Sequence, residues 1–132
     1  MLIQLLLSSQ LFLISIWYAY ITQQKILIFS FTISYLGSTQ YYINYHPNGK
    51  YHLIDLVTAR TGAMINFLYT FYYIKPYYLS ILLLHNITLI YILSYTLYYY
   101  KEPIWVKIHI YFHIWTTITS LLITYEGNCY LY

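Results

Sequence analysis

Four ionisable side chains stand in segments that are otherwise almost wholly apolar: His46, Asp55, His109 and His113. The i, i+4 spacing of His109 and His113 places both imidazoles on one side of a helix, about 6 Å apart along its axis. Two neutral imidazoles so placed can bind one metal ion, and a third histidine with a water completes a catalytic zinc site. His46 is the predicted third ligand. Asp55 is predicted to orient or deprotonate the zinc-bound water.

Each of these residues also has a structural interpretation. A histidine in an apolar helix can simply be hydrogen-bonded to a backbone carbonyl. Asp55 can pair with Arg60 or sit near the positive end of a helix dipole. Arg60 lies about 140° around the same helix, so we expect it to snorkel or to bind a lipid phosphate or a substrate carboxylate. His52 is predicted to be an exposed loop residue, and His85 to approach from the opposite membrane face.

The composition indicates a membrane protein. Hydrophobic residues make up 61% of the 132 residues and charged residues only 7%, whereas a soluble domain is about a quarter charged. So few charges cannot cover the surface of a small chain in water, but they suffice for a bundle whose belt faces lipid. The 21 tyrosines and the scarcity of Gly and Pro are typical of an AT-rich genome, such as that of a large DNA virus, an organelle or an endosymbiont.

Charge and cysteine usage exclude other classes of function. The formal charge of +3 comes from five scattered lysines and Arg60. Without a basic run or a stacking motif, nothing supports nucleic-acid binding. The single cysteine, Cys129, excludes an internal disulfide and a cysteine-rich metal site.

The apolar stretches divide into five of about 20 residues, the length that spans the hydrocarbon core of a bilayer. They are expected at 2–22, 26–45, 52–74, 77–100 and 104–125. The breaks between and after them are expected at Gln23–Lys25, His46–Lys50, Lys75–Pro76, Lys101–Pro103 and Glu126–Asn128. Barrel strands are excluded, because they are about ten residues long and alternate in polarity. The prediction is an all-α, multi-pass integral membrane bundle of about five transmembrane helices, with residues 1–132 forming a single transmembrane domain. Its first stretch is a retained helix rather than a cleaved signal.

Short connections make successive helices antiparallel. The loops after the second and fourth stretches therefore lie at one membrane face, and the other two at the opposite face. This places His46, Asp55, His109 and His113 at one face and at similar depth. An ionisable group inside a bilayer is costly, so this clustering favours a functional site.

The pattern resembles the membrane hydrolase superfamily that joins alkaline ceramidases, the progestin and adiponectin receptors and haemolysin III proteins. That family carries Tyr/Phe-His at the end of its second helix, Asp early in the third and His-x-x-x-His in the last; the matching residues are Tyr45–His46, Asp55 and His109–His113. The resemblance implies a zinc held by three histidines in a lipid-facing cavity that hydrolyses amide bonds of ceramide-like lipids. The family has seven helices. It also places a serine four residues before its first histidine, where this chain has Tyr42.

The leading functional prediction is a minimal zinc-dependent membrane hydrolase acting on a lipid amide or ester, with zinc on His46, His109 and His113 and with Asp55 as catalytic residue. Its predicted partners are the lipid bilayer and a lipid substrate, with a homo-oligomer or a larger membrane assembly left open. One alternative is a small structural subunit of an organellar respiratory or ATP-synthase complex, which would turn the histidines apart. Another is a haem held by two histidines on different helices.

Overall fold

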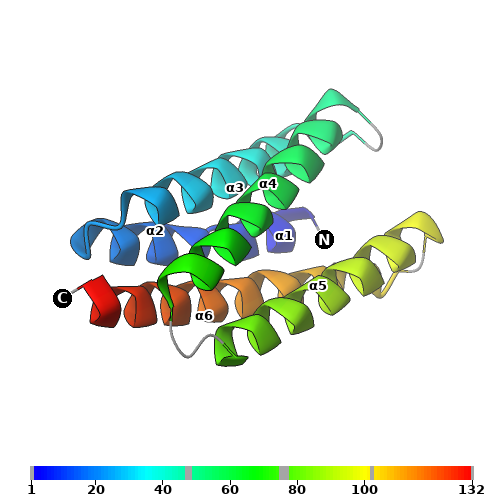
Figure 1. Cartoon of the computed structure of the whole chain (residues 1–132). Coiled ribbons are helices and arrows are strands. Elements are labelled where there is room, and N and C mark those ends of the chain that lie inside the picture. The colour runs from blue at the N-terminus through cyan, green and yellow to red at the C-terminus, as the bar shows by residue number, and fades with distance from the viewer. Residues whose placement is uncertain (1, 47–48, 75–77, 102, 132) are drawn as a thin grey trace.

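The computed structural model of the chain describes residues 2–46, 49–74, 78–101 and 103–131, and every regular element among them is an α-helix (Figure 1). This confirms the all-α prediction. In chain order the helices are α1 (Leu2–Ser9), α2 (Phe12–Ile21), α3 (Lys25–Ile43), α4 (Lys50–Tyr73), α5 (Tyr78–Tyr99) and α6 (Trp105–Leu131).

The first two helices form one rod with a tightened turn in its middle. The Gln10 and Leu11 amides donate to carbonyls three residues back, at 3.1 and 3.2 Å, which is the tighter hydrogen-bond pattern of a 3₁₀ turn. The described helices therefore make five rods, and they correspond to the five stretches expected from the sequence.

The observed helix ends follow the predicted breaks at most positions. Gln23 and Lys101 adopt positive φ angles of 57° and 58° between successive helices, as tight turns require. Some residues of the predicted breaks lie outside the described ones, namely Pro47, Asn48, Lys75, Pro76 and Glu102.

The last helix was predicted to stop at Glu126–Asn128, and this was wrong, because α6 continues through these residues to Leu131. Gly127 is buried there, and a Cβ at this position would lie 2.6 Å from the Tyr69 hydroxyl and 2.8 Å from Gln24 Oε1. The glycine therefore allows close packing against α4 and the α2–α3 turn and does not end the helix.

Two pairs of helices dominate the packing. α3 packs mainly on α4 and α5 on α6, while the α1–α2 rod lies against both α3 and α6. α4 and α5 make few contacts, and in Figure 1 the start of α4 and the end of α5 diverge. The polar site described below lies at this end of the molecule.

Small residues let α3 and α4 approach closely. A Cβ at Gly37 would overlap Thr58, and one at Gly62 would overlap Ser34. The Ser30 hydroxyl lies 3.0 Å from the Gly62 carbonyl and 2.8 Å from the Asn66 amide oxygen. Close backbones joined by side-chain hydrogen bonds are typical of helix pairs in membranes.

Two segments, Ile3–Ile21 and Trp105–Cys129, are long and apolar enough to cross a membrane. Among the described residues, buried polar side chains outnumber buried apolar ones, while many large apolar side chains are exposed on the outside. The exposed fraction is 71% for Ile3, 62% for Trp17 and 59% for Phe29.

Candidate functional site

His109 and His113 lie side by side on α6, with ring centroids 4.7 Å apart. His113 is only 1% exposed, and the Tyr42 ring packs against both imidazoles, at centroid distances of 6.2 and 5.9 Å. The spacing of the two histidines thus produces an imidazole pair inside the helical bundle, in which His113 is buried and His109 is partly buried.

Hydroxyl groups from three other helices bond to these imidazoles. The Tyr42 hydroxyl of α3 lies 2.7 Å from His109 Nε2, and the Ser94 hydroxyl of α5 lies 2.8 Å from His109 Nδ1. His113 Nδ1 lies 2.7 Å from the Ser8 hydroxyl of α1. The pair is therefore held from three sides.

The network around Ser8 assigns the tautomer of His113. The Ser8 hydroxyl donates its one hydrogen to the Leu5 carbonyl at 2.9 Å. It therefore accepts from His113 Nδ1–H, which leaves the lone pair of that imidazole on Nε2. Neutral His113 thus has an acceptor nitrogen on the side away from Ser8.

Asp55 is buried on α4, and its Oδ1 accepts a 2.7 Å hydrogen bond from the Ser38 hydroxyl. Ser38 and Tyr42 lie four residues apart on α3, so they share a helix face. One bonds to Asp55 and the other to His109. Through this face, α3 links the carboxylate of α4 to the imidazole pair of α6.

His46 lies beyond the end of α3 and is exposed, so the structure does not bring it to the imidazole pair. Among the residues that the structure describes, no three His, Cys, Asp or Glu side chains gather closely enough to hold a metal ion. As placed here, the donor set does not fit a three-histidine zinc centre, because Tyr42 stands beside the pair where a third imidazole would be needed. The zinc site stays a prediction from the sequence.

One spacing of the resembled family also occurs between Ser38 and Tyr42, while the resemblance itself stays a prediction from the sequence. The family has a serine four residues before its first histidine. Ser38 and Tyr42 have this spacing, and both point into the polar site.

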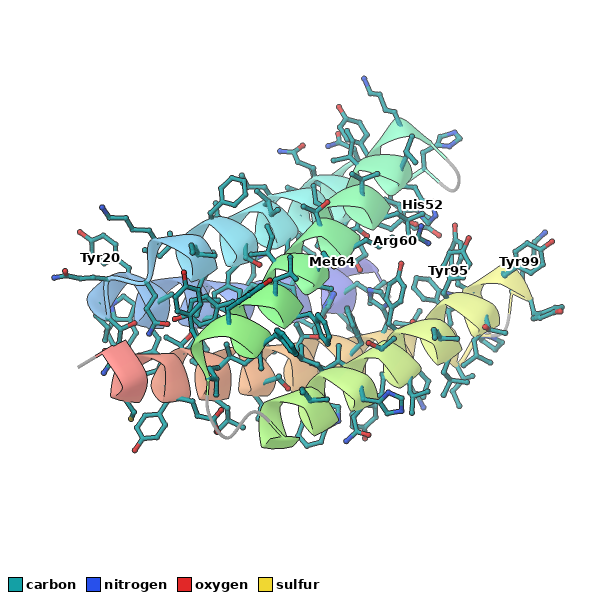
Figure 2. All side chains as sticks on the ribbon, viewed as in Figure 1. Tyr20, His52, Arg60, Met64, Tyr95 and Tyr99 are labelled. Atoms are coloured by element: carbon teal, nitrogen blue, oxygen red, sulfur yellow. The ribbon has the colours of Figure 1, made fainter. Side chains whose placement is uncertain are left out.

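A cavity of about 40 Å³ lies between α3, α4, α5 and α6. The polar residues among those that line it are Ser38, Tyr41, Tyr42, His52, Asp55, Tyr91, Ser94, Tyr95, Tyr98 and His109. In Figure 2, His52, Arg60 and Tyr95 lie at the end of the molecule where α4 and α5 diverge. The cavity is much too small for a haem, since pockets for such ligands measure hundreds of cubic ångströms.

Three buried polar atoms of the cavity lining have no hydrogen-bond partner among the described residues: Tyr41 Oη, His52 Nδ1 and Tyr91 Oη. Tyr41 lies beside Tyr98 and Tyr91 beside Arg60, but neither pair has hydrogen-bond geometry. Buried polar groups are nearly always paired, so unpaired ones point to water or a ligand.

His52 differs from its predicted place in an exposed loop. It lies in the first turn of α4, is half-buried, and stacks on Tyr98 with ring centroids 5.4 Å apart. Because α4 begins at Lys50, the residue faces the cavity rather than solvent. Two other polar residues, Arg60 and His85, are exposed on α4 and α5.

Sequence reasoning missed the hydroxyl partners of the histidines. Ser8 and Ser94 are each one of two serines in a largely apolar helix, so residue type alone does not single them out. The four-residue spacing of Ser38 and Tyr42 was available as a signal. With 21 tyrosines in the chain, nothing local distinguishes Tyr42 from the others. No family model, curated protein or solved structure matches this chain.

Proposed function

We propose that this chain is a multi-pass membrane protein that hydrolyses an amide or ester bond of a lipid at its buried cavity. The observation that carries the proposal is the convergence of Asp55 from α4 and His109 from α6 on one small cavity. A carboxylate and an imidazole in contact with the same water-sized space are groups that can move the protons of a hydrolysis.

The distribution of side chains supports the membrane part of the proposal. Large apolar residues cover the outside, and serines, threonines and other polar residues fill much of the inside. In water this arrangement would expose far more apolar surface than a soluble monomer tolerates. In lipid it is favourable, because the outer face meets acyl chains and the inner polar groups bond to one another.

Helix length supports the proposal that further helices cross the membrane, beyond the two segments that are both long and apolar enough to do so. Helices α3 to α6 contain 19 to 27 residues, or about 28–40 Å at 1.5 Å per residue, against a hydrocarbon core of about 30 Å. Many of these residues are tyrosines. Hydropathy scales count tyrosine as polar, although its ring is stable near the membrane interface.

The chemistry assigned to the chain uses its own side chains. Asp55 accepts a proton from the attacking water and passes it to the leaving group, while Ser38 holds one carboxylate oxygen in place. His109, fixed by Tyr42 and Ser94, faces the reacting carbonyl across the cavity. Only the scissile group has to enter the cavity, since the acyl chains can remain in lipid between α4 and α5.

An acid-to-amide substitution tests this function. Asp55→Asn keeps the shape of the side chain and removes the base, so hydrolysis should fall by about 10²–10⁴ while the protein still folds. Glu126→Gln, the same chemical change on α6, should leave the rate unchanged. Release of fatty acid from lipid amides and esters in detergent would be measured for all three proteins, with melting curves beside it.

The second candidate is the structural membrane subunit. The observation that favours it is the saturation of His109, whose two ring nitrogens both bond to hydroxyls, as in a purely structural network. An inactive wild type together with an Asp55→Asn protein that fails to accumulate would support this candidate and contradict the hydrolase.

A further inference from the structure

We propose that the cavity between α3, α4, α5 and α6 is a binding site for a primary ammonium group. The starting point is the set of unpartnered atoms that line it, Tyr41 Oη, His52 Nδ1 and Tyr91 Oη. Tyr41 is 4% exposed, so bulk water does not pair its hydroxyl. A ligand group that supplies hydrogen bonds to all three atoms would remove the cost of leaving them unpaired.

The charge of the lining favours a cation. Asp55 lines the cavity, and the described residues that line it include neither lysine nor arginine. Arg60 lies beside Tyr91 but is exposed. Its carboxylate is within electrostatic range of the Tyr41 and Tyr91 phenols. A buried carboxylate is costly, and a cation bound beside it in the cavity would offset that cost.

The aromatic rings of the lining point to the same ligand. Besides Tyr41 and Tyr91, the cavity is bordered by Tyr95, Tyr98 and Trp105. The faces of such rings attract cations, including the primary ammonium of a lysine side chain.

Hydrogen bonding and size select a primary ammonium over other cations. A –CH₂–NH₃⁺ end has three N–H donors. They match the phenol oxygens of Tyr41 and Tyr91 and the Nδ1 of His52 in the tautomer that protonates Nε2, while Asp55 supplies the charge. A cavity of about 40 Å³ has room for about three water-sized groups, which accommodates the two heavy atoms of this end. A quaternary ammonium is larger and has no hydrogen to donate.

Two sources can present this group: the head group of an ethanolamine lipid, or a free alkylamine. Arg60 is exposed beside Tyr91, where it could meet the phosphate of a lipid head group. The proposal shares Asp55 with the proposed hydrolysis, and a bound ammonium would block the base. Ammonium binding is measured at equilibrium and hydrolysis as a rate, so either proposal can fail while the other holds.

The test uses the full-length protein in a neutral detergent, titrated with ethylammonium chloride and followed by calorimetry and thermal unfolding. We expect saturable binding and a rise in Tm that ethanol, tetramethylammonium and sodium chloride at equal ionic strength do not produce. Asp55→Asn should abolish the effect, and Glu126→Gln should preserve it.

Tyr41→Phe is the decisive variant, because it removes a hydroxyl that has no hydrogen-bond partner in the part of the chain that the structure describes. Without ligand it should melt at the same temperature as wild type or higher. Its affinity for ethylammonium should nevertheless fall by about tenfold or more, the effect of losing one hydrogen bond to a charged group. Unchanged affinity in Tyr41→Phe, or an equal response to tetramethylammonium, would overturn the proposal.

A second arm identifies the source of the group. The protein is placed in phosphatidylcholine vesicles with and without phosphatidylethanolamine, and ethylammonium binding is measured again. Competition by phosphatidylethanolamine would show that the site takes the lipid head group. Binding that is the same in both vesicles would assign the site to a free amine, whereas no ethylammonium binding in either vesicle or in detergent would reject the site.

Discussion

At the scale of residues, one tyrosine decides the chemistry available to the imidazole pair. Tyr42 packs on both rings and bonds to Nε2 of His109. A phenol in that place gives a hydrogen-bonded network, whereas an imidazole would complete a three-nitrogen donor set for a metal. As the side chains are placed, a change of one side chain in α3 would therefore give the pair a third nitrogen donor.

This dependence predicts a gain of function. Tyr42→His should raise the zinc content of the purified protein to about one ion per chain, since three imidazoles suffice to bind zinc. Elemental analysis would compare it with wild type, with His46→Ala and with the double variant Tyr42→His/His113→Ala. The double variant should lose the metal, because it again has only two of the three imidazoles. A wild type that already carries one zinc, lost in His46→Ala, would contradict this expectation and support the ligand set predicted from the sequence.

At the scale of elements, the α3–α4 pair fixes the geometry of the site. Gly37 and Gly62 let the two backbones approach, and this brings Ser38 within 2.7 Å of Asp55. A similar contact holds the other end of the molecule, where the Gln24 amide nitrogen donates to the Thr124 carbonyl at 2.7 Å. Close packing at both ends leaves the weakly packed α4–α5 side as the flank on which the cavity lies.

Gly62→Val should therefore destabilise the bundle. The new side chain would meet the Ser34 hydroxyl and the Ser30 carbonyl, the latter 3.2 Å from the position of Cβ, and overpacking of this kind costs about 1–3 kcal/mol. Ala63→Val is the matched control, because Ala63 is the next residue of α4 and is exposed. Thermal unfolding in detergent should separate the two, and equal melting temperatures would argue against close α3–α4 packing.

At the scale of the whole molecule, five rods place the chain ends far apart. Figure 1 shows the N and C ends at opposite ends of the bundle, as expected for an odd number of antiparallel rods. If the rods cross a bilayer, the two ends lie on opposite sides of it. The polar cavity then lies towards the N-terminal side, with the diverging ends of α4 and α5.

Cysteine labelling in sealed, uniformly oriented vesicles would test this topology. Cys129 is the native thiol near the C-terminal end and is exposed. An Ile3→Cys/Cys129→Ser protein moves the thiol to the exposed N-terminal position. A membrane-impermeant maleimide should label one protein only from outside and the other only after permeabilisation. Equal labelling of both from the same side would rule out five spans.

The sequence by itself determined the features whose causes are local. Apolar stretches separated by proline, glycine and charged residues determined where the rods begin and end, within a few residues. The i, i+4 spacing of His109 and His113 determined that their rings share a helix face, since that follows from helical periodicity alone. The end of α6 was misplaced because Gly127 contacts a neighbouring helix, and packing partners of this kind leave no local signal.

Only the tertiary structure decided which side chains meet the imidazole pair. His46 was the obvious third partner by residue type, but it lies past the last residue of α3 and is exposed. Tyr42 lies within the last turn of that helix, and the rotation of α3 against α4 and α6 turns it onto His109. That rotation is set by side chains on three helices at once, so it cannot be read from any one of them.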